Sequence, residues 1–561
     1  MKKLQLFLLI AVLLISSQVF SQNLNDYIDE TRGDTLVIKD FNDLEEQNSL
    51  YQVITLDTTN VPAGRVYMLK SNGYYPLINN PATLRPTVIV GEDPTILVNN
   101  NNAESAPPII CGAAWDGGSN TGAMYVKHNL TVKNCNIIPA TANKGLGWNF
   151  FDVQSAEITL TFQNCLFERT RWVFTASGSP NVSWFIKDCY FVNMNGQPCR
   201  RNGGVLDCFT RQDTLWVENN THVMAQGFMY KFRSNTFNKV VFNHNTFINI
   251  SNLVFLDLGS QKDFTITNNI FVNCNVQPYG PKNADVGEED LEKQPIGFVN
   301  LIADTSIHVD RKFTVRNNLI YWSPELADVV DIVNQNKPQN SSEWVSQMIK
   351  MNARTKAMFD DDVNYPYLDE GGWIEKSPTF TDPKDLLTDQ VANLKEFSIK
   401  TVDTLSTDVL PDWRLVNIGD DYYTYSDWPI PVDLSYSDAD LKTAGTDGLP
   451  VGDLNWFPAL KPSAAIAPKT TPEKFALRQN YPNPFNPTTN INFTLPEPGN
   501  VTLKVYNMLG QEVATLINNE YRGANATHSI LFDASRLSSG VYFYTLTYGN
   551  KTVSKKMVLM K

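Results

Sequence analysis

The sequence predicts an all-β protein, a parallel β-solenoid followed by a small C-terminal β-sandwich. Three observations support this fold class. An eight-residue pattern recurs between residues 131 and 321, its strands are rich in β-branched and aromatic residues, and a Pro/Ala/Thr-rich linker precedes a last block of alternating strands. The 561 residues are enough for two or more domains.

The N-terminus has the three parts of a secretory signal peptide, expected over residues 1–21. Lys2 and Lys3 provide positive charge, an apolar run extends from Leu4 to Ile15, and a cleavage context precedes Gln22. The apolar run is short for a membrane span, and no other stretch approaches about 18 apolar residues. We therefore expect a chain that is exported and then secreted or held on the outer cell surface.

The net charge of the chain limits its expected partners, and the positions of its cysteines indicate whether they form disulfides. The formal charge of −13 excludes nucleic acid as an expected partner, because phosphate binding needs a basic surface. The seven cysteines are an odd number and all precede residue 275. Their place in the repeat predicts stacked free thiols rather than disulfides, since in-register parallel neighbours seldom offer the disulfide torsion.

The repeat defines the first domain. Its copies are TVKNCNII from Thr131, TFQNCLFE from Thr161, FIKDCYFV from Phe185, WVENNTHV from Trp216, VFNHNTFI from Val241, TITNNIFV from Thr265 and TVRNNLIY from Thr314. A unit of about 24 to 31 residues without a helical period is typical of a solenoid coil. Each strand should pair with its equivalent about 4.8 Å away in the next coil.

The fifth column of the repeat predicts a structural ladder. It contains Cys135, Cys165 and Cys189, followed by Asn220, Asn245, Asn269 and Asn318. Asparagine amides stacked at this spacing can pair donor to acceptor along the axis. His244 falls in the fourth column among asparagines, so we interpret it as a solvated or turn-bonded histidine rather than a ligand.

These features resemble the right-handed parallel β-helix proteins of the pectate-lyase type. Arg65–Leu77 with Thr87–Asp93 resembles their opening coils, Lys376–Pro383 their closing segment, and Thr446–Pro458 the tail of extracellular β-helix proteins. The resemblance implies an N-terminal cap and first coils at 22–128, the β-helix at 129–323, and an inserted loop and helix with a closing segment at 324–458. Within the insert, Ser341–Phe359 has helical apolar spacing.

A second set of strands between the ladder segments carries the candidate site. Its alternation is expected to place Asp207, Lys231 and Asp257 on one face of adjacent coils, with Arg233 on the same face as Lys231. The resemblance to lyases implies Asp207 and Asp257 as Ca²⁺ ligands and Lys231 as the catalytic base. Arginines that could bind substrate carboxylates are Arg169, Arg171, Arg200, Arg201 and Arg233.

Two functions remain open from this face. The first is a surface protein that binds extracellular polysaccharide and catalyses no reaction. This function remains open because an Asp–Lys–Asp column also arises from charge pairing between neighbouring strands. The second is a calcium-assisted polysaccharide lyase of the pectate or alginate type. Whether the protein is an enzyme is left undecided by the sequence.

The C-terminal block follows a linker at 459–474 and spans 475–561. Alternating strands are expected at Ile491–Leu495, Val501–Tyr506, Val541–Tyr548 and Lys551–Met560, with a hairpin turn at Asn507–Gln511. Short strands at this spacing predict a small Ig-like β-sandwich.

This block resembles the type A C-terminal sorting domain of the type IX secretion system. The residues that carry the resemblance are Asn480, Pro482, Asn483, Pro484, Phe485, Gly510, Gly540, Tyr542, Lys555 and Lys556. The resemblance implies passage from the periplasm across the outer membrane, with the type IX machinery as partner. It also implies removal of the domain as the cargo is released or anchored to surface lipopolysaccharide.

Overall fold

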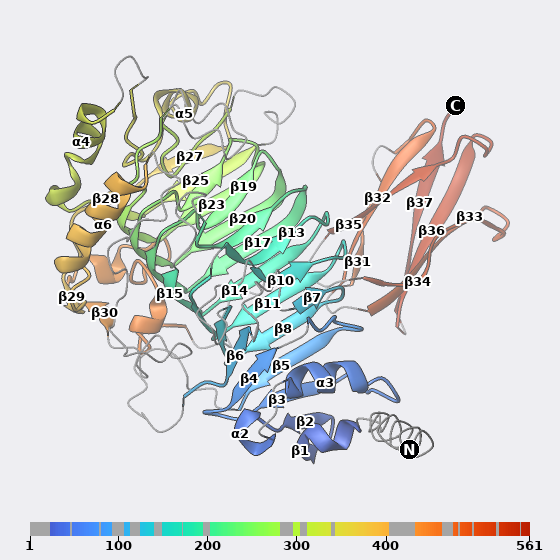
Figure 1. The fold of residues 1–561 in the computed structure, drawn as a ribbon. Helices are drawn as coiled ribbons and strands as arrows, with labels where there is room; N and C mark the ends of the chain where they lie inside the picture. Colours follow the sequence, from blue (N-terminus) through green and yellow to red (C-terminus); the bar gives the residue numbers. More distant parts are fainter. Residues whose placement is uncertain are drawn as a thin grey trace, which may run out of the picture.

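The computed structural model describes residues 23–44, 48–77, 80–92, 106–112, 124–139, 149–170, 172–194, 202–280, 295–302, 311–337, 343–402, 432–462, 475–480, 483–495, 499–522, 527–549 and 551–561. Three sheets with parallel strand pairing wind through the first part of the chain, as expected of a β-helix (Figure 1). The predicted fold class is therefore confirmed. The segment proposed as signal peptide lies outside the described residues.

In the described residues, the first sheet, sheet A, has 12 strands, and of these only β1 and β2 pair antiparallel. Its strands are β1 (Ile28–Arg32), β2 (Thr35–Ile38), β3 (Val66–Leu69), β5 (Thr87–Gly91), β8 (Leu130–Lys133), β11 (Thr159–Gln163), β14 (Ser183–Lys187), β17 (Gln212–Glu218), β20 (Phe237–Asn243), β23 (Asp263–Thr267), β25 (Lys312–Arg316) and β27 (Leu368–Gly371). From β8 to β25 they contain the first residues of the repeat, paired in the predicted register.

Sheet B has ten strands and sheet C has six. Sheet B consists of β4 (Tyr74–Leu77), β6 (Ile109–Gly112), β9 (Asn136–Ile138), β12 (Leu166–Glu168), β15 (Tyr190–Met194), β18 (Thr221–Ala225), β21 (Thr246–Ile250), β24 (Ile270–Cys274), β26 (Leu319–Tyr321) and β28 (Ile374–Glu375). Sheet C consists of β7 (Met124–Val126), β10 (Asn149–Val153), β13 (Val173–Ser177), β16 (Gly204–Cys208), β19 (Tyr230–Arg233) and β22 (Phe255–Asp257). From β5 to β22, each coil therefore passes from sheet A to sheet B and then to sheet C.

The corner from sheet A to sheet B depends on residues that tolerate a left-handed backbone. The fourth column of the repeat adopts φ between 52° and 60° in every copy, at Asn134, Asn164, Asp188, Asn219, His244, Asn268 and Asn317. Asparagine and aspartate populate this region most readily among non-glycine residues, which explains their prevalence in the column.

The predicted ladder occupies the next column and is confirmed. Its asparagines are buried, and each amide donates to the next one in the series Asn220, Asn245, Asn269 and Asn318 at 2.9 Å. The six cysteines in the described ranges are free and buried, three of them in this column. Packing inside the helix is aromatic, with His222 stacked between Phe191 and Phe247 at ring-centroid distances of 4.6 and 4.2 Å.

A C-terminal strap, residues 432–462, lies against the sheet A–sheet B corners of successive coils. Its contacts with the fourth column run from Asn317, which donates to Ala444 O, through Asn268 and Thr446, to Asp188, which pairs with Lys461. Because the strap residue numbers rise while the coil numbers fall, this segment runs back along the helix axis. The strap also contains β30 (Asp433–Tyr436), which pairs with β29 (Phe380–Asp382).

Helices cap and flank the sheets. The described α-helices are α2 (Phe41–Leu44), α3 (Ser49–Leu56), α4 (Val329–Gln335), α5 (Ala353–Phe359) and α6 (Asp389–Lys400), with 3₁₀ turns at Leu24–Tyr27, Pro324–Leu326, Leu441–Thr443 and Leu454–Trp456. Among them, none is long and apolar enough to cross a membrane.

The helix predicted over Ser341–Phe359 is shorter in the structure. It begins only after Asn352, whose side chain accepts a hydrogen bond from Thr355 N. The preceding described residues are not helical, and Val345 forms an isolated antiparallel bridge with Tyr279. A tertiary strand contact therefore outweighs the local helical pattern.

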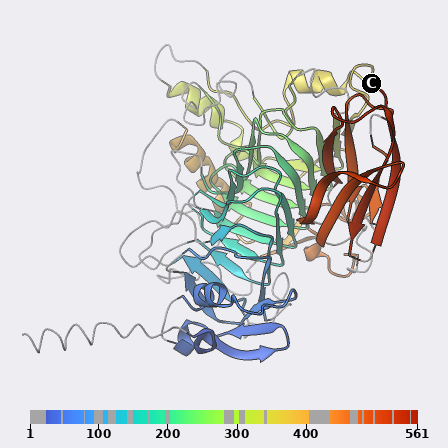
Figure 2. The ribbon, with the colours of Figure 1, turned by 90° about the vertical axis from the view of Figure 1, so that its right-hand side faces the viewer.

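The C-terminal block folds as two antiparallel sheets around their own core (Figure 2). One sheet has β31 (Ala476–Leu477), β32 (Thr488–Thr494) and β35 (Thr527–Asp533). The other has β33 (Gly499–Asn507), β34 (Glu512–Arg522), β36 (Gly540–Tyr548) and β37 (Lys551–Leu559). The predicted small sandwich is thus present.

Candidate functional site

The outer face of sheet C brings Asp207 and Lys231 together, as predicted. They are register partners on β16 and β19, and their side chains lie 3.5 Å apart. Asp257 does not join them. Lys231 pairs with Leu256, and a register shift places Asp257 opposite Arg233. Simple alternation could not reveal this shift, since one extra residue changes which side chains share a face.

Asp207 is the centre of a buried polar cluster. Its carboxylate accepts two hydrogen bonds from Arg233, at 2.8 Å from Nε and 3.0 Å from Nη2, and one from Trp172 Nε1 at 3.0 Å. Lys231 Nζ donates to Asn202 Oδ1 at 3.0 Å. A buried carboxylate with bidentate guanidinium contacts is strongly held in place.

Aromatic side chains complete this region at the surface. The Arg233 guanidinium lies 5.0 Å from the centroid of the Phe209 ring, and Trp172 lies 5.9 Å from the same ring. Phe209 is 47% exposed and the Arg233 side chain 24% exposed, whereas Asp207 and Lys231 are buried. We call Trp172, Asp207, Phe209, Lys231 and Arg233 the sheet C patch.

Asp257 instead supports the turn that leaves sheet C. Its Oδ1 accepts from Gly259 N at 2.9 Å, and its backbone oxygen accepts from Asn300. Burial raises the pKa of Asp257 to about 6, although the hydrogen bond from Gly259 opposes this. The two carboxylates predicted to bind Ca²⁺ therefore do not converge.

Within the described parts of the chain, no group of three or more His, Cys, Asp or Glu could hold a metal ion. A calcium ion at Asp207 would also compete with Arg233 and Trp172 for both carboxylate oxygens. The roles of Asp207 and Asp257 as calcium ligands, and of Lys231 as base, stay predictions.

The remaining predicted arginines are not all assembled on the patch. Arg169 is buried at a left-handed corner position with φ 52°, at the end of β12. Arg171, Arg200 and Arg201 lie outside the described residues, so their predicted role in binding substrate carboxylates stays a prediction.

Sequence reasoning missed Trp172, Asn202 and Phe209. A signal was present for the two aromatic residues, because Trp172 directly precedes β13 and Phe209 directly follows β16, the strand of Asp207. Asn202 had no comparable signal, since it precedes a strand from a loop and meets Lys231 only through the fold.

His244 is neither exposed nor part of the sheet C patch. It is 2% exposed, and its Nε2 lies 2.9 Å from Asp447 of the strap. Burial opposes ionisation of Asp447, but the hydrogen bond and charge of His244 outweigh it and lower the pKa of this carboxyl. His244 therefore holds the strap to its coil.

The residues predicted as a sorting signal mostly build the C-terminal domain. Asn483 Oδ1 accepts from Val558 N at 2.8 Å, and Phe485 N donates to Val558 O at 3.0 Å, which fixes the start of the domain to its last strand. Asn480 donates to Thr489, and Tyr542 donates to Ser538 O. Pro482 lies outside the described residues.

The other members of this set lie on turns and strands. Pro484 follows Asn483 in the segment that meets β37, Gly510 adopts φ 77° in the β33–β34 turn, and Gly540 begins β36. Lys555 and Lys556 lie on β37, paired with Tyr544 and Phe543. The role of these residues as the recognised signal stays a prediction.

Comparison with known proteins identifies this domain. Residues 479–560 match the family model described as a secretion system C-terminal sorting domain. No curated protein and no solved structure matches the chain. The domain engages the type IX secretion machinery, which carries the protein across the outer membrane to the cell surface or the medium.

Proposed function

We propose that this exported β-helix protein binds an acidic extracellular polysaccharide through the sheet C patch. The observation that supports the proposal is an exposed aromatic ring, Phe209, against which the guanidinium of Arg233 is fixed by a buried carboxylate. Aromatic rings bind the apolar faces of sugars, and arginine binds carboxylates, so the pair suits an acidic sugar.

Charge within the patch favours the same ligand. Lys231 and Arg233 carry two positive charges against the single negative charge of Asp207, on a chain whose formal charge is −13. A guanidinium has five N–H donors, and the part of Arg233 that reaches the surface can contact a sugar carboxylate while Asp207 orients it.

Binding to immobilised polygalacturonate and alginate tests the proposal, with Phe209→Ala as the variant. We expect this substitution to reduce affinity by about tenfold, which corresponds to a loss of about 1.4 kcal/mol when the aromatic contact is removed. Val363→Ala is the matched control, since Val363 is 90% exposed and distant in sequence from the patch. Affinity should also fall with added salt.

No affinity for any acidic polysaccharide would contradict the proposal. So would equal binding by the Phe209→Ala and Val363→Ala proteins. Arg233→Gln is less suitable as the first variant, because it would leave the buried Asp207 carboxylate without its main partner.

The second candidate, a calcium-assisted lyase, rests on the burial of Lys231 within the sheet C patch. The side chain of Lys231 is 3% exposed and lies 3.5 Å from the carboxylate of Asp207. A lysine can accept a proton only in its neutral form. Incubation with acidic polysaccharides, with and without calcium, would distinguish lyase action from binding alone. Proton abstraction by a lyase forms an unsaturated product that absorbs at about 235 nm. Activity that persists in Lys231→Gln would exclude this base.

A further inference from the structure

The exposed apolar side chains of the sorting domain gather at one end of the domain. Within its described residues, the large apolar side chains that are exposed are Met508, Leu509, Leu531, Phe543 and Met560. The turn between β33 and β34 contains the two most exposed of them, Leu509 at 82% and Met508 at 71%. Singly exposed apolar residues are common on soluble proteins, whereas several gathered together mark an interaction site.

The strand register brings the other three residues to the end that this turn occupies. β33 ends beside the start of β36, because Asn507 pairs with Tyr542, and Phe543 follows in the first half of β36. β37 runs antiparallel to β36, so it ends at the same place, with Met560 directly after it. Leu531 lies near the end of β35, which a short connection joins to the start of β36. We call these five exposed residues the apolar end of the sorting domain.

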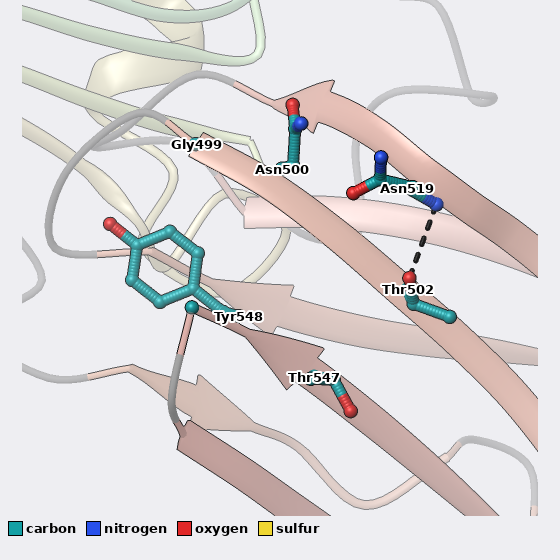
Figure 3. A pocket seen from close by; sticks show the side chains of 7 residues that line it. Gly499, Asn500, Thr502, Asn519, Thr547 and Tyr548 are labelled. Atoms are coloured by element: carbon teal, nitrogen blue, oxygen red, sulfur yellow. Dashed lines mark hydrogen bonds between the residues drawn. The ribbon is translucent and has the colours of Figure 1, made fainter.

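The opposite end of the same sheet is polar and receives the linker. The side chains there are amides and hydroxyls, those of Asn500, Thr502, Asn519 and Thr547 (Figure 3). The linker enters at this polar end, since the ring of Phe475 lies 5.6 Å from the ring of Tyr548, at the end of β36. The apolar end is therefore the end of the domain that is remote from the linker to the β-helix.

The sorting domain is basic, although the whole chain is acidic. Residues 475–561 contain eight Lys or Arg and four Asp or Glu, whereas the formal charge of the chain is −13. The cations at the apolar end are all at least partly exposed, and they are Arg536, Lys555, Lys556 and Lys561. Among the described residues at this end, the carboxylates are those of Asp533 and Glu512, and Glu512 is paired with Lys504 at 2.9 Å. The apolar end therefore has an excess of positive charge around it.

From this arrangement we infer that the apolar end of the sorting domain docks on an anionic lipid surface. A membrane interface accepts protruding apolar side chains at the boundary of head groups and acyl chains, and the phosphates of anionic lipids attract the Lys and Arg that surround them. Protein interfaces are depleted in lysine, so the lysines around Met508 and Leu509 favour lipid over a protein partner. Export across the outer membrane brings the domain to such a surface.

Sedimentation of the intact chain with lipid vesicles tests the inference. The anionic vesicles contain phosphatidylethanolamine and phosphatidylglycerol, and vesicles of phosphatidylcholine alone are the zwitterionic comparison. The main variant combines Met508→Ser with Leu509→Ser, which removes the apolar groups from an exposed turn without touching the core. Val363→Ser is its matched control, because Val363 is 90% exposed and lies outside the sorting domain.

A second pair of variants tests the contribution of charge. Lys556→Gln removes a cation at the apolar end, next to Phe543, its register partner. Lys551→Gln is the matched control, because Lys551 is also exposed on β37 but pairs with Tyr548 at the linker end.

We expect binding to the anionic vesicles that is weakened by about tenfold or more in the double serine variant and by about fivefold in Lys556→Gln. Val363→Ser and Lys551→Gln should bind as the wild type does. Phe209→Ala should also bind the vesicles normally, so failure of this inference is separable from failure of the polysaccharide proposal.

Absence of vesicle binding, or equal binding by the double serine variant and Val363→Ser, would overturn the inference. A dimer in solution that the double serine variant dissociates would also overturn it, because a second copy of the chain would then cover the apolar end.

Discussion

Replacement of Asn245 by alanine should open the β-helix locally at the centre of the ladder. Asn245 is fully buried. Its Nδ2 donates to Val217 O and to Asn269 Oδ1 at 2.9 Å, and its Oδ1 accepts from Asn220 N at 3.1 Å and from Asn220 Nδ2 at 2.9 Å. The side chain therefore links three successive coils.

The free energy that Asn245→Ala should cost follows from the groups that lose a hydrogen-bond partner. Asn269 Oδ1 keeps its bond from the backbone N of Asn245, and Asn220 Nδ2 keeps its bond to Ile186 O. Asn220 N and Val217 O each lose the hydrogen bond from the deleted amide. Each of these two buried groups should cost about 1–3 kcal/mol, so the stability of this part of the β-helix should fall by about 2–6 kcal/mol.

Native-state hydrogen exchange of peptides covering β17 to β24 is the suitable assay, because a chain with several domains does not unfold in one step. The control is Asn238→Ala on β20, since Asn238 is exposed and its change should cost about 0.5 kcal/mol or less. Asn245→Cys should lie between the two, because cysteine occupies the same column in three earlier coils. Equal protection in Asn245→Ala and Asn238→Ala would refute the reasoning.

Three further predictions concern buried groups and the strap. Burial lowers the pKa of His222 to about 3, so below about pH 6.5 only the unfolded chain binds a proton at this residue. Stability therefore falls as the pH falls from about 6.5 towards 3, and His222→Phe should flatten this acid side of a plot of the thermal midpoint against pH. Near pH 7 the substitution should cost about 1 kcal/mol, because the Tyr230 hydroxyl loses its partner. A profile as steep as wild type would contradict this. Burial raises the pKa of Asp453 to about 6, so the folded state favours the protonated carboxyl and the stability that this provides is lost as the pH rises from about 4 through 6. Relative to Asp453→Asn, the wild type should lose about 2 kcal/mol between pH 4 and 7, and parallel profiles would exclude this. Gly452→Ala should weaken the contact of the strap with the coils and speed proteolysis of the strap. The reason is that Gly452 has φ 83° and that a Cβ atom there would lie 2.6 Å from Ile270 Cδ1. Unchanged proteolysis would show that the strap tolerates the side chain.

Much of the β-helix was predictable because its interactions repeat at a fixed spacing. The ladder positions Asn220, Asn245, Asn269 and Asn318 were identified from one column of the sequence, and each successive pair forms the same amide-to-amide hydrogen bond in the structure. The sorting domain was predictable for a different reason, because its turn and strand signals are local and its motif residues are dense.

The candidate site was predicted only in part. The pairing of Asp207 with Lys231 followed from alternation, but Asp257 was displaced by a single register shift in β19–β22. Trp172 was placed near the strands of this face by its position before β13, but its hydrogen bond to Asp207, 35 residues later, is formed only in the folded chain.

The sequence by itself determined the parallel coils, the ladder and the export route, since each depends on side chains that repeat or cluster along the chain. Only the tertiary structure decided what the unrepeated residues do. It placed His244 against Asp447, 203 residues later in the chain, and gathered the sheet C patch from three coils. The physical reason is that a hydrogen bond between distant segments depends on where the backbone brings them, and the sequence specifies that position only through the completed fold.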